Sequence, residues 1–300
     1  MSFDSAPPTN EELLGLAPYG ACPGATPGAC AFAPTSVVWD EARIHRCGRC
    51  GHGVTRPAMT ETRALYDDRD SQDFQGRDGI VVRTIKKIAF ARSARRVAVL
   101  VPEGARTAYD FGCGSGAWTE AMDDAAPDVS FTGLDFFDDA PGTMCRVAYQ
   151  SFDAAARSGR RADLVTCFHV LEHDDDPHAL LDRVLGLLKP GGTLIAEVPH
   201  ADAVGGRVFG RRWDNWYLPY HRTHFTARSL RDLLTAHGLT DIVIEPVCVP
   251  SVGRSLARMA GRRNGWPFVL LGAALHPLQW AAEQLTRQPS ALRARAVAAG

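Results

Sequence analysis

Residues 108–116 read AYDFGCGSG: an apolar run, an aspartate, and then three glycines alternating with small residues. The run RTAYDF (106–111) has the composition of a buried strand, and GAWTEAMDDAA (116–126) that of a helix. Glycines between a strand and a helix let the backbone turn sharply and approach a ligand closely. The first N–H groups of the helix are then available to that ligand. This stretch predicts a ligand-binding loop at the carboxyl end of a strand.

The segments that follow alternate between strand-like and helix-like patterns. The run ADLVTCFHV (162–170) is apolar almost throughout, as in strands that are buried on both faces. Further strands are expected at 129–137, 193–199, 241–249 and 292–299, and helices at 176–188 and 226–238. Strands that alternate with helices of this length predict an α/β fold with a mostly parallel sheet.

Composition limits the class of partner. The chain has 300 residues, 45% hydrophobic and 22% charged, which suits one large globular domain with an appendage. A net charge of −1 gives no electrostatic case for nucleic acid as a partner. The first residues show no secretory signal pattern, and eight cysteines in a chain of this length do not resemble a disulfide scaffold. We therefore expect a cytoplasmic protein; composition predicts no oligomeric state.

A second motif concerns the ligand. Asp135 ends the strand-like run in GLDFF, 23 residues after Gly112. A carboxylate at that place accepts hydrogen bonds from both hydroxyls of a ribose. The pair of motifs predicts a ligand that contains a nucleoside, and Gly112, Gly114 and Ala117 also satisfy the dinucleotide pattern G-x-G-x-x-G/A.

From about residue 106 to residue 240 the sequence resembles the class I S-adenosylmethionine-dependent methyltransferases. The resemblance rests on YDFGCGSG, GLDFF, ADLVTCFHVLEHDDDPHALLDRVLGLLKPGGTLIAEVPH and HRTHFTARSLRDLLTAHGL, in the family's order and spacing. It implies a Rossmann-like fold with a mostly parallel seven-stranded sheet, helices on both faces, and methyl transfer from S-adenosylmethionine. An aspartate opening the glycine motif suits this family, because it attracts an ammonium group and would repel a pyrophosphate.

The resemblance also implies roles for single residues of the cofactor site. Asp110 would bind the methionyl ammonium, directly or through water, and Asp135 would hold the ribose. The loop beneath the methionine portion would consist of Gly112, Gly114 and Gly116. The remaining cofactor contacts would come from Phe136, Ser151, Phe152, Phe168 and His169.

The N-terminal part resembles a small zinc ribbon that precedes the methyltransferase domain in a subset of this family. It carries Cys47-x-x-Cys50, half of a tetrahedral zinc site, with Cys22 and Cys30 upstream. The wide spacing of Cys22 and Cys30 departs from a second short knuckle, so His45 and His52 are alternative ligands and a metal-free ribbon is a further alternative. The expected organisation is a ribbon at 1–60, a helical linker or lid at 61–105, and the methyltransferase domain at 106–300.

Two insertions in this domain, 201–225 and 250–285, are expected to form a cap over the sheet. The first is rich in aromatic and basic residues and suits a ring-bearing or amphipathic acceptor. The candidates for substrate binding are Trp213, Trp216, Tyr217, Tyr220, Arg222 and His224. Imidazole titrates near neutral pH, and His200 and His221 are the candidates for a general base. Residues 264–282 carry no charge, which favours a buried helix pair or pocket wall over an interfacial membrane contact, with no stable membrane span.

The function predicted is methylation of a small molecule, with a hydroxyl of a natural product, sugar or lipid-like precursor of secondary metabolism as the favoured acceptor. Transfer to nitrogen or carbon, an NAD-dependent oxidoreductase, and a catalytically inactive interaction protein are the alternatives.

Overall fold

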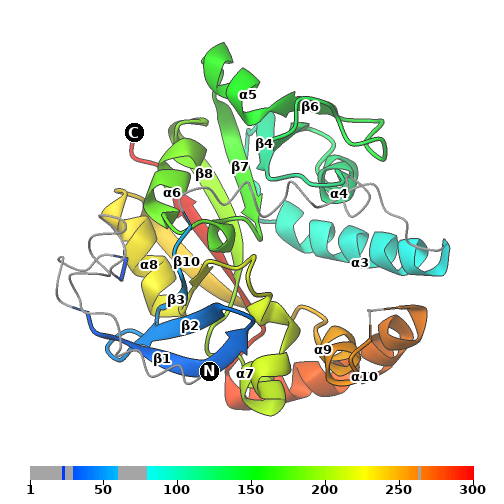
Figure 1. Cartoon of the computed structure of the whole chain (residues 1–300). Helices are drawn as coiled ribbons and strands as arrows, with labels where there is room; N and C mark the ends of the chain where they lie inside the picture. Colours follow the sequence, from blue (N-terminus) through cyan, green and yellow to red (C-terminus); the bar gives the residue numbers. More distant parts are fainter. Residues whose placement is uncertain (1–21, 24–29, 60–79, 263–264) are drawn as a thin grey trace.

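The computed structural model describes residues 22–23, 30–59, 80–262 and 265–300. Two sheets dominate the molecule, and helices cover the larger of them on both faces (Figure 1). The strands are β1 Phe32–Trp39, β2 Ala42–Cys47, β3 Gly53–Arg56, β4 Thr107–Phe111, β5 Ser130–Asp135, β6 Ala148–Ser151, β7 Ala162–Phe168, β8 Leu188–Pro199, β9 Thr223–His224, β10 Thr240–Val247 and β11 Ala291–Val297. The helices are α3 Ile80–Ala98, α4 Ala117–Ala125, α5 Phe152–Ser158, α6 Pro177–Leu185, α7 Val204–Phe209, α8 Ala227–Ala236, α9 Val252–Met259 and α10 Trp266–Thr286.

The large sheet has seven strands in the order β10-β11-β8-β7-β4-β5-β6. The five strands from β8 to β6 pair in parallel, and β11 pairs antiparallel with both β8 and β10. From β4 the chain first adds β5 and β6 on one side and then β7 and β8 on the other. The carboxyl ends of β4, β5 and β7 therefore meet at a topological switch point. The predicted α/β fold with a mostly parallel seven-stranded sheet is confirmed.

Two apolar layers hold this sheet between its helices. Leu181 and Leu233, from α6 and α8, belong to the layer on one face, and Val97 and Met122, from α3 and α4, to the layer on the other. Strand β7 contributes to both, since Leu164 lies in one layer and its neighbour Val165 in the other. Burial on both faces explains why the sequence of β7 is apolar almost throughout.

The small sheet joins the N-terminal segment to the cap. Its order is β1-β2-β3-β9, and β3 pairs antiparallel with β9 through Gly53 and His224. Thr55 N also donates to the Arg222 carbonyl at 2.7 Å. The predicted ribbon and the first cap insertion are therefore one structural unit. The part of the predicted linker between residues 60 and 79 lies outside the described residues.

The second cap insertion connects β10 to β11 and consists of α9 and α10. Residues 266–282 of the uncharged segment lie in a single helix, α10, which continues through Pro277. Several large apolar side chains of this helix are exposed, so the prediction of a buried helix pair is corrected. Among the described residues, no helix combines the length and the apolar character needed to cross a bilayer.

Candidate active site

The loop after β4 depends on glycine at two positions. Gly112 has φ 79° and Gly116 φ 73°, both in the left-handed region that favours glycine. A Cβ at Gly112 would collide with Val170 Cγ2, and a Cβ at Gly116 would lie 2.7 Å from Met144 Cγ. The loop therefore forms a tight backbone cradle that opens into α4, as the sequence predicts.

Asp135 fastens the other side of this cradle. It ends β5, and its Oδ2 accepts a hydrogen bond from Gly114 N at 2.8 Å while Oδ1 accepts one from Phe136 N at 2.8 Å. Burial raises the pKa of Asp135 above its usual range, against these two hydrogen bonds. The structure thus brings the predicted ribose carboxylate into direct contact with the glycine loop.

Asp110 lies below the loop, inside β4. It is 2% exposed, and its two carboxylate oxygens accept hydrogen bonds from Thr119 Oγ1 at 2.5 Å and Thr166 Oγ1 at 2.8 Å. Burial raises the pKa of Asp110 to about 6. The side chain ties β4 to β7 and α4, and its predicted contact with the methionyl ammonium stays a prediction.

The other predicted cofactor residues surround the same strand ends. Ser151 caps α5 by accepting a hydrogen bond from Ala154 N at 3.4 Å, and Phe152 stacks on Phe111 with ring centroids 4.1 Å apart. Phe168 ends β7 with its ring 4.8 Å from that of Trp118. The side chains of these three residues serve the cap of α5 and the core, and their predicted cofactor contacts stay predictions, as does that of Phe136.

A cluster of charged side chains lies beyond the end of β7. His169 Nδ1 lies 3.3 Å from Glu172 Oε1 and His169 Nε2 lies 3.3 Å from Glu197 Oε1. Glu197 is also paired with Arg293 at 2.7 Å. Desolvation alone would lower the pKa of His169, but the hydrogen bonds and charges of the two glutamates outweigh it and raise the pKa to about 10. His169 is therefore a cation at neutral pH.

His221 adjoins this cluster in a different charge state. Its Nδ1 lies 2.9 Å from the Asn215 carbonyl oxygen, so Nδ1 carries the proton, and its Nε2 lies 3.8 Å from Glu172 Oε1. Burial, reinforced by the neighbouring His173, holds the pKa of His221 well below its usual range. Glu172 is 1% exposed, and its Oε2 has no hydrogen-bond partner among the described residues. His221 thus presents a neutral imidazole with an unprotonated Nε2 beside a buried carboxylate.

The second candidate base, His200, lies at the end of β8. Its Nδ1 is 3.1 Å from the Pro289 carbonyl oxygen, and burial lowers its pKa. His200 N donates to the Ser290 carbonyl, which also accepts from Asn215 Nδ2, so the partner of His221 lies between the two predicted bases.

The aromatic cap divides into an interior and a surface. Trp213 is fully buried and Trp216 is 6% exposed, and both pack in the apolar cluster of the small sheet. Arg222 is 1% exposed and forms an ion pair with Asp175 at 3.0 Å. His224 is likewise buried, with Nε2 3.0 Å from Thr55 Oγ1. All four side chains hold the cap together in this structure, and the predicted substrate contacts of Trp213, Trp216, Arg222 and His224 stay predictions.

Tyr217 and Tyr220 are better placed for an acceptor. Their rings stack 5.0 Å apart, and the ring of Tyr217 lies 5.2 Å from that of His221. The guanidinium of Arg258 lies 5.9 Å from the centroid of the Tyr217 ring and 5.8 Å from that of Trp39. Beside this stack is a cavity of about 350 Å³ lined by Val38, Trp39, Asp40, Arg211, Arg212 and Arg258.

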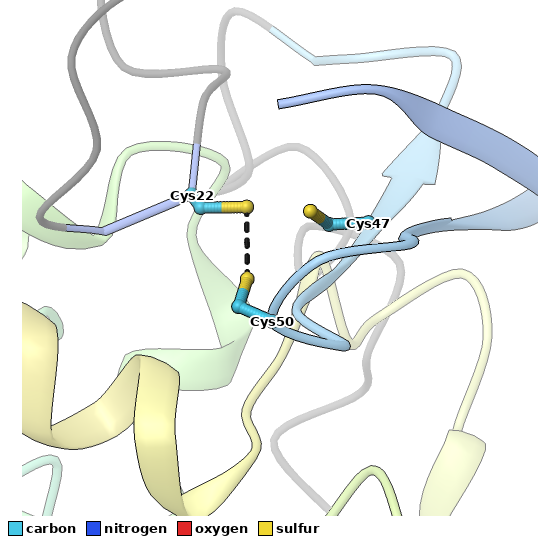
Figure 2. A group of neighbouring side chains, drawn as sticks. All are labelled: Cys22, Cys47 and Cys50. Carbon is cyan, nitrogen blue, oxygen red and sulfur yellow. Dashed lines mark hydrogen bonds between the residues drawn. The ribbon is translucent and has the colours of Figure 1, made fainter. Parts of the chain in front are cut away.

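The N-terminal cysteines form one cluster (Figure 2). The sulfur atoms of Cys22, Cys47 and Cys50 lie within 4.8 Å of one another, and Cys50 Sγ is 3.0 Å from Cys22 Sγ. Cys30 packs against the same buried cluster. His52 instead lies with Nδ1 3.2 Å from Ser229 Oγ, which ties the ribbon to α8. Four cysteines suit a tetrahedral zinc site, and His52 is not needed for it.

Sequence reasoning missed Glu172, Glu197, Arg293 and Arg258. Glu172 had a local signal, since it lies in the run VLEH between two of the histidines considered. Glu197 and Arg293 had none, because they meet only where β11 pairs with β8.

The chain is similar in sequence to known proteins. A family model described as a methyltransferase domain matches residues 86–243. The chain is 39% identical over 100 residues to a ubiquinone biosynthesis O-methyltransferase of Methylococcus capsulatus, covering 30% of this chain and 41% of that protein. It is 37% identical over 114 residues to a trans-aconitate 2-methyltransferase of Methylobacterium radiotolerans, covering 36% of this chain and 44% of that protein. The matches thus span less than half the length of these two relatives.

Among solved structures, a SAM-dependent methyltransferase from Archaeoglobus fulgidus aligns with a TM-score of 0.48 at 18% identity, covering 70% of this chain and 94% of that one.

Proposed function

Since the chain belongs to the methyltransferase-domain family, within the class I S-adenosylmethionine-dependent methyltransferases, we propose that it transfers a methyl group to a hydroxyl of a small-molecule acceptor. The observation that carries this proposal is the cradle formed by the glycine loop and Asp135, in contact through Gly114 at 2.8 Å. The names of the two relatives, which refer to methylation of small molecules, support the acceptor class.

The chain's residues fit the cofactor. Gly112 and Gly116 adopt the left-handed backbone that the tight loop requires, with Val170 and Met144 packed against them, and Asp135 offers a carboxylate at the strand end where a ribose binds. When bound, S-adenosylmethionine supplies a methyl group on a sulfonium, whose leaving group is a neutral thioether. What remains for the protein is to align the acceptor and to take up its proton.

We propose that His221 takes up this proton. Its Nε2 carries no proton in the arrangement shown, and its low pKa keeps the ring neutral at pH 7. As the acceptor oxygen takes the methyl group, its hydroxyl proton would move to Nε2 of His221. The buried carboxylate of Glu172, 3.8 Å away, stabilises the imidazolium that results.

The cavity beside Tyr217 supports an acceptor that carries an anionic group. Its lining includes three arginines and one aspartate, and the ring of Trp39 forms an apolar wall. An arginine guanidinium binds a carboxylate or phosphate in a bidentate manner. The proposed acceptor is therefore a phenol or other ring-bearing alcohol with an acidic substituent.

Transfer of a labelled methyl group from S-adenosylmethionine tests this proposal. The acceptors are 3,4-dihydroxybenzoate, its neutral amide 3,4-dihydroxybenzamide, and 4-aminobenzoate. We expect the label on a hydroxyl oxygen of 3,4-dihydroxybenzoate. The KM for the amide should be at least about tenfold higher than the KM for the acid, since the pairing of a carboxylate with an arginine is lost. Arg212→Glu should remove this preference. Transfer to the amine alone, or equal KM values for acid and amide, would contradict the acceptor class.

For the cysteine cluster we propose a structural zinc ion held by Cys22, Cys30, Cys47 and Cys50. The convergence of the four side chains on one buried cluster supports it.

A further inference from the structure

A helix on the surface of a globular protein buries its apolar side and exposes its polar side, whereas α10 does the reverse. Its protein-facing side carries Gly272, Gln279 and Glu283, all buried. Gln279 Nε2 donates to the Val249 carbonyl at 2.8 Å and to Glu283 Oε1 at 2.7 Å, and Glu283 Oε2 accepts from Ser290 N at 3.1 Å. The polar groups of this helix are therefore used to anchor it to the protein.

The outward side of α10 is apolar. No Asp, Glu, Lys or Arg occurs between residues 266 and 282. The exposed fractions are 63% for Trp266, 44% for Leu270, 68% for Leu278, 54% for Trp280 and 86% for Leu285. These positions fall on one half of the helix circumference, and Met259 at the end of α9 is exposed as well. Single exposed apolar residues are ordinary, but a continuous face of this kind marks a contact surface.

The segments that flank α10 and the helices that contact it carry basic residues. Arg262 and Arg287 are exposed just before and after α10, and Arg207 is exposed on α7, which contacts α10. Helix α3, a further contact of α10, carries six lysines and arginines and no acidic residue. Figure 1 shows α3, α9 and α10 on the same side of the molecule. In a chain whose net charge is −1, positive charge is thus concentrated beside the apolar helix.

We propose that the outward face of α10 is a membrane-contact surface, which lies in the interface of a bilayer with anionic lipids. Tryptophan and leucine on one face with arginine and lysine at its borders are the features of helices that bind in the plane of such an interface. Each cation near an anionic leaflet adds to the attraction. A second copy of the chain fits less well, because a symmetric contact centred on α10 would bring two cationic borders together.

Vesicle flotation with the full chain tests this surface. Vesicles of phosphatidylcholine with 30% phosphatidylglycerol are compared with pure phosphatidylcholine, and wild type with Leu278→Glu/Trp280→Glu. The control is Val243→Glu, which places one glutamate on an exposed apolar position of β10, and each single variant, Leu278→Glu and Trp280→Glu, is compared with it at equal charge. We expect wild type and control to bind anionic vesicles at least about tenfold more strongly than neutral ones, and the double variant to lose this binding. High salt should weaken it.

Light scattering after gel filtration measures the mass of the same proteins. A monomeric wild type that floats with anionic vesicles supports the membrane surface. A dimeric wild type that becomes monomeric in the double variant and floats with neither vesicle would overturn it in favour of a contact between copies. Equal flotation of wild type and double variant would overturn it too. Cofactor binding by the double variant shows that a loss of flotation is not a loss of fold.

Discussion

The charge state of His169 is set by two glutamates that the fold places beside its ring. Its φ of 57° places it in the left-handed region, where the turn after β7 points its ring between Glu172 and Glu197. At neutral pH it is a cation held by two carboxylates, and its contribution is to position Glu172 beside His221.

The raised pKa of His169 predicts a pH dependence of stability. The folded-state pKa of about 10 exceeds the unfolded value near 6.5, so the stabilisation is fully present below pH 6.5 and is lost as the pH rises through 10. His169→Asn keeps a residue that tolerates positive φ. We expect this variant to be less stable than wild type in urea unfolding at pH 6, with a difference that shrinks toward pH 10. A difference that does not change with pH would contradict the cationic assignment.

The candidate bases make opposite predictions for turnover. His221→Asn should lower kcat by about 10²–10⁴-fold while the Kd for S-adenosylmethionine stays within about twofold, because only proton removal is lost. His200→Asn is the matched comparison and should retain most of kcat. Since burial lowers the pKa of His221, wild-type kcat should be constant above pH 7 and fall in acid. Loss of kcat in the His200 variant alone would move the role of base to His200.

At the level of helices and strands, α9 and α10 cross at a pair of glycines. A Cβ at Gly253 would collide with the Phe268 carbonyl oxygen and would lie 3.0 Å from Gly272 Cα. Gly253→Ala should therefore destabilise the protein by about 1–3 kcal/mol, since backbone must move to admit one methyl group. Gly142→Ala, where a Cβ meets nothing within 4 Å, is the control and should change stability by less than about 0.5 kcal/mol. Equal effects of the two substitutions in urea unfolding would contradict the close crossing.

The elements of the large sheet were predictable where their pattern was strong. The strands β4, β5 and β7 form within the ranges that their apolar runs predict, and β11 begins one residue before the range predicted at 292–299. The helix predicted at 176–188 ends at Leu185, and the stretch KPGG (189–192) that follows the predicted range lies inside β8, where the register with β7 shifts between Ala162 and Leu164. The exposure of the apolar side of α10 was not predictable, because an uncharged segment is normally expected to be buried. Only the structure shows that Gln279 and Glu283 anchor this helix by its polar side.

At the scale of the whole molecule, the cysteine cluster lies at one end of the small sheet, whose last strand, β9, belongs to the cap insertion at 201–225. Cys47 ends β2, and β3 continues the same sheet to β9 beside His221 and Arg222. The cysteine motif itself was visible in the sequence. The pairing of β3 with β9 was not, since it joins residues about 170 positions apart through a strand of two residues.

We expect one zinc ion per chain by elemental analysis. Cys47→Ser should lower both the zinc content and Tm, because metal binding contributes to folding. Cys145→Ser removes an exposed thiol outside the cluster and is the control. A protein without zinc whose Tm is the same in Cys47→Ser as in wild type would contradict the zinc proposal and leave a metal-free ribbon.

The central claim is that the glycine loop and Asp135 form the binding site for S-adenosylmethionine. Calorimetric titration with S-adenosylmethionine and with NAD tests it on wild type, Asp135→Ala and the control Asp139→Ala, which removes an exposed carboxylate from the same connection. We predict micromolar binding of S-adenosylmethionine to wild type and control, affinity lowered at least about tenfold in Asp135→Ala with its circular dichroism unchanged, and no binding of NAD. Unchanged affinity in a folded Asp135→Ala, or binding of NAD in place of S-adenosylmethionine, would contradict the account.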